Sequence, residues 1–249
     1  RTEADQRAYR AAQLLRPVAV DVSLLRVGDA GDGGYVMADA FDARRAISLG
    51  VGPNVSWDAD VARRGITVAM FDPTIPGPPA AVEGASFHRI GLGTAEQAGA
   101  LSMDLVLFDR ILALAEVGDG EALLKIDIEG AEWDALAGVA DFSRFPQIAL
   151  EMHDLARLGD AATAINVLAV LEAIGRTHVP VHIHANNEVP AVPFGRYWLS
   201  DTVEVSYLRR DLARGARPAT AIDTSLDSPS NARFADVSLE GLLGAAPID

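Results

Sequence analysis

The stretch ALLKIDIEGAEWDAL, residues 122–136, predicts the central unit of the fold. Residues 123–128 form a short apolar run with Asp127 near its end, which is typical of a buried parallel strand that brings an acid to the edge of a sheet. Glu129 and Gly130 turn the chain, and apolar residues then recur at helical spacing. Because ligands of open α/β sheets bind at the carboxyl ends of the strands, we expect a site beside Asp127. A strand that ends in a solvated acidic turn would explain the same residues.

Composition restricts the class of protein. The chain has 249 residues, of which 49% are hydrophobic, and this suits one large α/β domain. Its formal net charge of −14 offers no basic surface, so we expect neither nucleic acid nor a membrane as a partner. The absence of cysteine excludes disulfides, thiolate metal sites and cysteine nucleophiles. No apolar run of about 18 residues occurs, so a soluble, cytoplasmic protein is expected.

Residues 45–72 have the pattern of a nucleotide-binding β-α-β unit. A strand leads into the loop GVGPN, which begins at Gly50, and after a helix a second strand ends on Asp72. Glycines let backbone approach a cofactor, an acid at this strand end can accept the ribose hydroxyls, and the expected spacing is roughly 20 residues. The third glycine of the dinucleotide pattern is missing and the loop has no basic residue, which favours a nucleoside without phosphates.

A glycine-rich segment precedes this unit. Residues 24–39 predict a hairpin whose turn contains Asp32, Gly33 and Tyr35. Glycine permits close backbone approach, so this turn can also contact a ligand. A hairpin without any ligand contact explains the same pattern.

Strands and helices continue to alternate after Asp72. Pro73 opens a proline-rich loop, which we expect to cover the adenine of a nucleoside bound at this β-α-β unit. The remaining strands are predicted at residues 85–90, 147–150, 179–184 and 202–207, and the remaining helices at residues 5–15, 101–117 and 161–174. This alternation predicts a mostly parallel sheet that is closed by a strand pair late in the chain.

Three segments are predicted along the chain. Residues 1–45 form an N-terminal helix and a glycine-rich hairpin, and residues 46–212 form the main domain. Residues 213–249 are rich in Ala, Pro, Ser and Asp, which predicts an irregular tail that wraps the domain or crosses to a neighbour. An exposed apolar tail would favour a homodimer.

Four motifs within about residues 24–155 resemble the FkbM-type family of S-adenosylmethionine-dependent methyltransferases: KIDIEGAEWDAL, SLGVGPNVSWD, FDP and DGGYV. The resemblance implies a class I methyltransferase fold, which is Rossmann-like, doubly wound and α/β. Such a fold has a mostly parallel sheet of seven strands, helices on both faces and a late antiparallel strand. The resemblance also implies S-adenosyl-L-methionine as the cofactor and methyl transfer, usually to oxygen, on a sugar or another small molecule.

The resemblance also assigns residues of the cofactor site. It makes Gly50 and Gly52 the cofactor loop and Asp72 the ribose-binding acid, while Asn54 replaces a third glycine. With the hairpin turn, the predicted cofactor contacts are Asp32, Gly33, Tyr35, Gly50, Gly52, Asn54, Asp72 and Pro73.

Methyl transfer from a sulfonium needs the acceptor oxygen held in line with the methyl group and a means of removing its proton. In one interpretation, Asp127, Glu151, His153 and His182 bind Mg²⁺ or Mn²⁺, which lowers the pKa of the acceptor hydroxyl. In the other, His153, His182 or His184 is a general base without a metal. The candidate catalytic residues are therefore Asp127, His153 and His184, and the metal is slightly favoured.

Other interpretations use the same residues. His182 can be a core residue, and Glu129 and Glu132 can be surface charges. An NAD-dependent oxidoreductase would share the β-α-β unit, although the missing glycine and the lack of a Tyr-x-x-x-Lys pair count against it. A nucleoside-binding protein without turnover is a third possibility if the histidines are packed. The polar segment 184–187 suits a polyhydroxylated acceptor such as a sugar, or is a turn.

Overall fold

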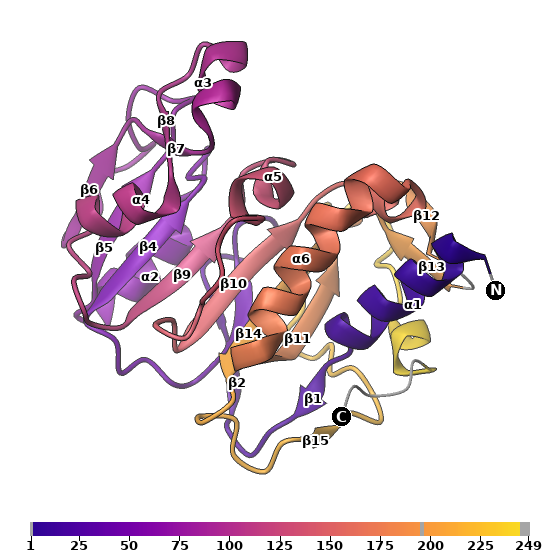
Figure 1. The fold of residues 1–249 in the computed structure, drawn as a ribbon. Coiled ribbons are helices and arrows are strands. Elements are labelled where there is room, and N and C mark those ends of the chain that lie inside the picture. Colours follow the sequence, from indigo (N-terminus) through magenta and orange to yellow (C-terminus); the bar gives the residue numbers. More distant parts are fainter. Residues whose placement is uncertain (1, 195–196, 245–249) are drawn as a thin grey trace.

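The computed structural model describes residues 2–194 and 197–244 (Figure 1). Within these residues, a central sheet has seven strands, which in chain order are β4 (Arg45–Leu49), β5 (Thr67–Phe71), β6 (Ala85–His88), β9 (Ala122–Ile126), β10 (Gln147–Met152), β11 (His178–Ala185) and β14 (Val203–Arg209). The strands lie in the order β11-β14-β10-β9-β4-β5-β6. The predicted mostly parallel α/β sheet is therefore confirmed.

One strand of this sheet is antiparallel. β14 pairs antiparallel with both β10 and β11, whereas the remaining pairs of neighbours are parallel. If the parallel strands are numbered along the chain, their order is 3-2-1-4-5-6, with β14 between the last two. This is the strand order of Rossmann-like sheets, in which ligands bind where the order reverses. Here the reversal lies between β4 and β9.

Alternate residues of the strands face two different cores. In β9, Leu124 and Ile126 belong to one hydrophobic cluster and Leu123 belongs to the other. The first cluster includes residues of α1 (Glu3–Leu15), α4 (Phe108–Leu114), α5 (Glu132–Leu136) and α6 (Ala161–Thr177). The second includes residues of α2 (Ser56–Arg63) and of the hairpin β2 (Leu24–Val27) and β3 (Tyr35–Ala38). Helices thus lie on both faces of the sheet, as Figure 1 shows for α6 and α2.

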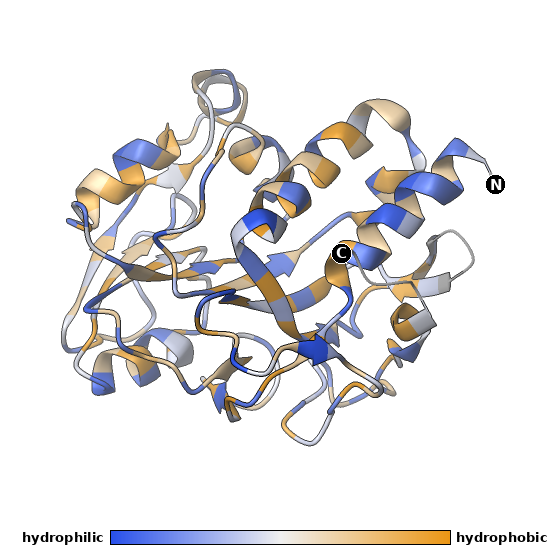
Figure 2. Cartoon of the chain, turned by 60° about the horizontal axis from the view of Figure 1, so that its bottom comes forward, coloured by the Kyte–Doolittle hydropathy of each residue, from blue (hydrophilic) through white to orange (hydrophobic). Residues whose placement is uncertain are grey.

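The N-terminal helix packs by a single face. Thr2 and Asp5 form a capping box at the start of α1, and its buried residues recur at helical spacing: Ala8, Ala11, Ala12 and Leu15. The hydrophilic residues of α1 form the remaining faces of the helix (Figure 2). None of the helices in the described residues has the length and apolar content that a membrane crossing requires.

The predicted helix at residues 101–117 was wrong. A capping box between Thr94 and Gln97 begins α3 (Ala95–Leu101) earlier, and Ser102, with a φ of 54°, ends it. The next residues form β8 (Leu105–Val106), which pairs with β7 (Gly91–Leu92), and α4 follows. The helix predicted at residues 161–174 extends, as α6, through Gly175 to Thr177. At residues 95–106, local capping and strand pairing outweighed hydrophobic periodicity.

The described part of the tail lies against the domain. β15 (Arg217–Pro218) pairs with β1 (Val18–Ala19), and later residues lie across β11 before the short helix η2 (Glu240–Gly244). A second hairpin, β12 (Ala191–Phe194) and β13 (Tyr197–Ser200), precedes β14. Residues 245–249 of the predicted tail lie outside the described residues. The boundaries of the three predicted segments and the homodimer stay predictions.

Candidate functional site

A cavity of about 500 Å³ lies where the carboxyl ends of β4, β5, β9 and β10 meet. Its volume is in the range of small-molecule sites, which is roughly 300–1,000 Å³. Most of the residues predicted for the cofactor, the metal or catalysis line it: Asp32, Gly33, Gly50, Gly52, Asn54, Asp72, Pro73, Asp127, Glu151 and His153. Residues that are far apart in the sequence therefore share one cavity.

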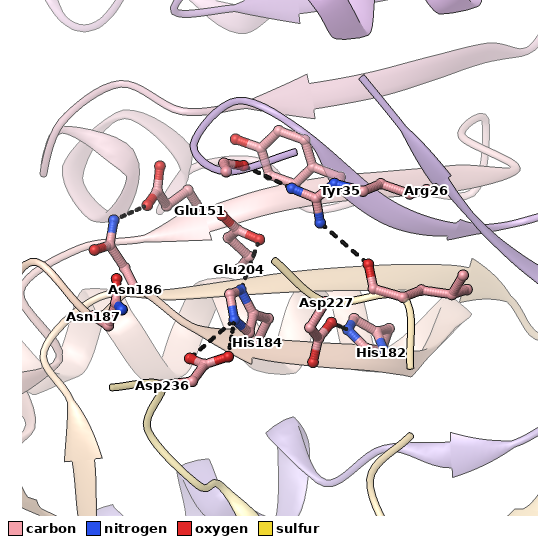
Figure 3. Close-up of polar contacts among 12 residues, drawn as sticks. Arg26, Tyr35, Glu151, His182, His184, Asn186, Asn187, Glu204, Asp227 and Asp236 are labelled. Atoms are coloured by element: carbon pink, nitrogen blue, oxygen red, sulfur yellow. Dashed lines mark hydrogen bonds and ion pairs between the residues drawn. The ribbon is translucent and has the colours of Figure 1, made fainter. Parts of the chain in front are cut away.

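Tyr35 lies behind the cavity wall rather than on it. Its ring is buried, and its hydroxyl donates to Asp127 Oδ2 at 3.3 Å (Figure 3 shows the ring). Burial, and then the charge of Asp127, raise the pKa of Tyr35. Tyr35 therefore supports the carboxylate of Asp127, and its predicted contact with a cofactor stays a prediction.

The glycine loop needs its first glycine for packing against the protein itself. Gly50 has a φ of 79°, and a Cβ at this position would lie 1.5 Å from the backbone carbonyl oxygen of Asp127. The loop thus crosses directly over the end of β9. At Gly52, by contrast, a Cβ would meet no atom of the described residues within 4 Å, so they leave space open beside the loop. At Gly50 the loop thus packs closely on the protein's own backbone, and its predicted approach to a cofactor stays a prediction.

Asp72 holds this loop with both carboxylate oxygens. Oδ2 accepts hydrogen bonds from the backbone N–H groups of Val51 and Gly52, each at 3.0 Å. Oδ1 accepts from Thr74 N at 2.8 Å and Thr74 Oγ1 at 2.6 Å. Burial alone would raise the pKa of Asp72, but these hydrogen bonds bring it below its usual range. Since a carboxylate offers about four acceptor positions, ribose hydroxyls would have to share them with the chain.

Asn54 joins the glycine loop to the hairpin turn. Its Nδ2 donates to the backbone carbonyl of Asp32 at 3.0 Å, and its Oδ1 accepts from Ser56 N at 2.8 Å. A Cβ at Gly33 would lie 2.8 Å from Asn54 Nδ2, so the turn packs tightly on the loop. The two glycine-rich segments therefore form one continuous wall of the cavity.

An acidic cluster forms the opposite wall. Ligand atoms of Asp127, Glu151 and His153 all lie within 4.8 Å of one another. Asp127 Oδ1 is buried and has no hydrogen-bond partner among the described residues, whereas Glu151 Oε1 accepts from Asn186 Nδ2 at 3.0 Å (Figure 3). Burial, followed by the charges of Asp127 and Glu204, raises the pKa of Glu151 well above its ordinary value. Carboxyl groups crowded in this way favour a proton or a cation nearby.

Glu132 orients the histidine of this cluster, and the sequence did not predict that role. Glu132 is fully buried, and its Oε1 lies 3.0 Å from His153 Nδ1. The same oxygen accepts from the backbone N–H groups of Ile128 and Gly130, at 3.1 and 3.3 Å. The surface position considered for Glu132 is therefore wrong. The helical spacing of residues 131–136 contained the signal, since it places Glu132 on the same face as the buried Leu136, four residues later.

The other ring nitrogen of His153 faces acids. Nε2 lies 3.4 Å from Glu129 Oε2 and 4.0 Å from Glu151 Oε2. Burial by itself lowers the pKa of His153, but the hydrogen bond and charge of Glu132, with the other acids, outweigh it and raise this pKa to about 9. With Nδ1 held by Glu132, Nε2 is the nitrogen available to a cation or a substrate.

Lys125 connects the two walls, and it too was missed. The side chain is 3% exposed, and Nζ donates to the carbonyl oxygen of Gly50 at 2.7 Å and lies 3.5 Å from Asp127 Oδ2. Hydrophobic periodicity assigns Lys125 to the interior of β9 and contains no sign of a ligand site. Gly50 follows a different strand, β4, so only the folded chain reveals this contact.

His184 reaches the acids of the cavity through Glu204. Its Nδ1 lies 3.4 Å from Glu204 Oε2, and its Nε2 lies 3.1 Å from Asp236 Oδ2 in the tail (Figure 3). Glu204 in turn groups with Asp32 and Glu151. Burial lowers the pKa of His184, yet Glu204 and the tail acids raise it overall to about 9.

His182 is not brought to the cavity. Its Nε2 lies 2.7 Å from Asp227 Oδ1, and both side chains are buried (Figure 3). It lines a separate cavity of about 440 Å³, to which residues of β1 and of the tail also contribute. The structure therefore separates His182 from Asp127, Glu151 and His153.

No protein-family model matches the chain, and no curated protein matches it either. The resemblance to FkbM-type methyltransferases thus stays a prediction that rests on the four motifs.

Proposed function

We propose that the chain is an S-adenosyl-L-methionine-dependent methyltransferase with a class I, doubly wound fold, and that it methylates a hydroxyl group on a sugar or a small natural product. One observation carries this proposal. The glycine loop held by Asp72 and the cluster of Asp127, Glu151 and His153 line the same cavity at the carboxyl ends of the parallel strands. A nucleoside and an acceptor hydroxyl could therefore lie side by side.

The lining of the cavity suits the cofactor. Open space beside Gly52 leaves room for a ligand, and an apolar part of the wall suits an adenine ring: Leu92, Leu101, Met103 and Leu105. No lysine or arginine of the described residues lies in the glycine loop, which suits a nucleoside without phosphates. When bound, the cofactor supplies a methyl group already activated by its sulfonium.

The acidic cluster also suits a divalent cation. Asp127 Oδ1 lacks a partner among the described side chains, and Glu132 holds Nδ1 of His153, so that Nε2 is available as a ligand. A carboxylate behind the imidazole is the usual arrangement around metal-bound histidine. Two carboxylates and one imidazole suit Mg²⁺ or Mn²⁺, and the imidazole favours Mn²⁺. Such a cation would lower the pKa of an acceptor hydroxyl.

A metal-free version uses the same histidine. Glu132 fixes the ring of His153, and Nε2 could take the proton of the acceptor hydroxyl once the ring is deprotonated. Because the pKa of His153 is raised to about 9, this version requires activity that increases toward alkaline pH. Activity that persists in EDTA would support this version. Activity that is lost in EDTA and restored by Mn²⁺ would support the cation.

Calorimetric titration with S-adenosyl-L-homocysteine tests the proposal. We expect binding to the wild-type chain, and mass spectrometry of candidate glycosides or alcohols incubated with S-adenosyl-L-methionine should then show the gain of one methyl group. Absence of binding, with or without Mn²⁺, would overturn the proposed function. Binding of NAD in place of S-adenosyl-L-homocysteine would support the NAD-dependent oxidoreductase. Binding of S-adenosyl-L-homocysteine without any methyl transfer would support the nucleoside-binding protein. The cytoplasmic location stays a prediction.

A further inference from the structure

Charge is distributed very unevenly around the cavity. Six acids line it: Asp32, Asp72, Asp127, Glu129, Glu151 and Glu188. Among the described residues, Lys125 is the only lysine or arginine that lines the cavity. An anionic group of any ligand would be repelled by most of this surface, because like charges in a partly buried site disfavour each other. Lys125 is therefore the place where such a group can bind.

The ammonium group of Lys125 has donor capacity left for a ligand. It carries three N–H donors. In the described part of the chain its oxygen partners are Gly50 O, at 2.7 Å, and Asp127 Oδ2, at 3.5 Å. The ring of Tyr35 lies on a further side, with its centroid 5.6 Å from Nζ. Buried donors are nearly always hydrogen-bonded, so the third N–H calls for water or a ligand atom in the cavity.

We propose that Lys125 binds the α-carboxylate of the methionyl part of the cofactor. This inference rests on the proposed function, since it takes S-adenosyl-L-methionine as the ligand. The cofactor has two positive groups, the sulfonium and the α-ammonium, and one negative group, the α-carboxylate. The acids of the cavity attract the first two, and Lys125 is the charge complement of the third. Its bonds to Gly50 and Asp127 place Lys125 between the loop and the acidic cluster, where the methionyl part would lie.

The test compares two ligands that differ in this group. S-adenosyl-L-homocysteine contains the amino-acid part, and 5′-methylthioadenosine lacks it. In the full chain, Lys125→Gln removes the charge but retains a donor for Gly50. We expect it to weaken S-adenosyl-L-homocysteine binding about 10- to 100-fold more than 5′-methylthioadenosine binding, as measured by calorimetry. Equal losses for the two ligands would overturn the assignment, because they would indicate a purely structural role.

Lys125→Arg is the matched control. It retains the positive charge and donor groups, so it should recover most of the discrimination between the two ligands. If Lys125→Arg discriminates between the two ligands no better than Lys125→Gln does, the result would count against a charge-dependent contact between residue 125 and the α-carboxylate. A wild-type chain that binds neither ligand would instead overturn the proposed function, so the two failures differ.

If both variants fail to fold, binding of a modified ligand to the wild-type chain still tests the proposal. Decarboxylated S-adenosylhomocysteine lacks only the α-carboxylate. If Lys125 binds that group, the decarboxylated ligand should bind about 10- to 100-fold more weakly. If the α-carboxylate instead lies among the acids of the cavity, its removal relieves charge repulsion. Decarboxylated S-adenosylhomocysteine that binds as tightly as S-adenosyl-L-homocysteine, or more tightly, would therefore overturn the proposal.

Discussion

The carboxylate of Asp72 accepts hydrogen bonds from three residues of the chain, and its substitution therefore tests the loop as well as the ligand. In Asp72→Ala, the N–H groups of Val51 and Gly52 lose their acceptor. We expect stability to fall by about 1–3 kcal/mol, the usual cost of leaving buried donors unsatisfied. We also expect the affinity for S-adenosyl-L-homocysteine to fall about tenfold or more, since the loop loses its anchor. Urea unfolding and calorimetry measure the two effects.

Asp141 provides a matched control for Asp72. It makes the same pair of bonds to the residue two positions on, to Ser143 N and Ser143 Oγ, both at 2.8 Å. It lies on the exposed surface and outside the cavity. Asp141→Ala should leave ligand affinity unchanged, and an equal loss of affinity in both variants would contradict a specific role for Asp72.

The lowered pKa of His178 should make the free energy of unfolding depend on pH. Burial lowers its pKa from 6.5 to about 4, despite the bond of its ring to the carbonyl of Phe145 at 2.7 Å. Between these pH values the unfolded chain binds a proton that the folded chain does not bind. Stability is therefore complete above about pH 6.5 and decreases as the pH falls toward 4, by up to about 3 kcal/mol.

The variant His178→Gln isolates this contribution. Glutamine stays neutral and can still donate to the carbonyl of Phe145. Urea unfolding at several pH values between 7 and 4 should show a weaker pH dependence in the variant than in the wild type. The same dependence in both proteins would mean that His178 is not the titrating group.

At the scale of elements, the junction of β4 and β9 depends on one glycine. Gly50→Ala places a Cβ against the carbonyl of Asp127, 1.5 Å away, in a backbone conformation with a φ of 79°. The loop and the end of β9 must then separate, so we expect a large loss of stability and no ligand binding. Gly65 has a similar φ, 81°, but the Cβ of Gly65→Ala would meet nothing within 4 Å in the described part of the chain. It should cost only the strain of the left-handed conformation, about 1–2 kcal/mol. Similar losses in urea unfolding of both variants would contradict the close crossing.

Helices and strands that form through interactions between residues close in the sequence were easier to predict than those that depend on residues far apart. β9 and α5 were predicted closely from residues 122–136, because their apolar periodicity agrees with their burial. The segment at residues 95–114 was not, because Thr94, Ser102 and the pairing of β8 with β7 divide a continuous apolar stripe. Pairing partners that lie more than ten residues apart are invisible to a periodicity count.

At the scale of the whole molecule, the tail and the late strands form one polar layer. Asp227 and Asp236 come from the tail and meet His182 and His184 of β11 (Figure 3). Asn187 extends this contact, since its Nδ2 donates to the backbone carbonyl of Asn231 at 3.0 Å. The tail thus supports the strand end from which Asn186 reaches Glu151 in the cavity.

This layer predicts a loss of stability at alkaline pH. The pKa of His184 is raised to about 9 in the folded chain, so the folded state binds the extra proton between pH 6.5 and 9. Stability is complete below about pH 6.5 and falls as the pH rises through 9. His153 titrates in the same window, so the measurement is the difference in melting temperature between the wild type and His184→Gln. A difference that does not change from pH 6 to pH 9.5 would contradict the prediction.

The sequence alone determined the α/β class, the parallel strands and the set of acids and glycines at their carboxyl ends, because strand periodicity and turn residues are local properties. Parallel strands then bring Gly50, Asp72 and Asp127 to one edge of the sheet. Only the tertiary structure decided which groups these residues contact. It paired Lys125 with Gly50 and Glu132 with His153, and it moved His182 away from the site. Such partners are chosen by packing between distant segments, and a hydrophobic pattern contains no information about them.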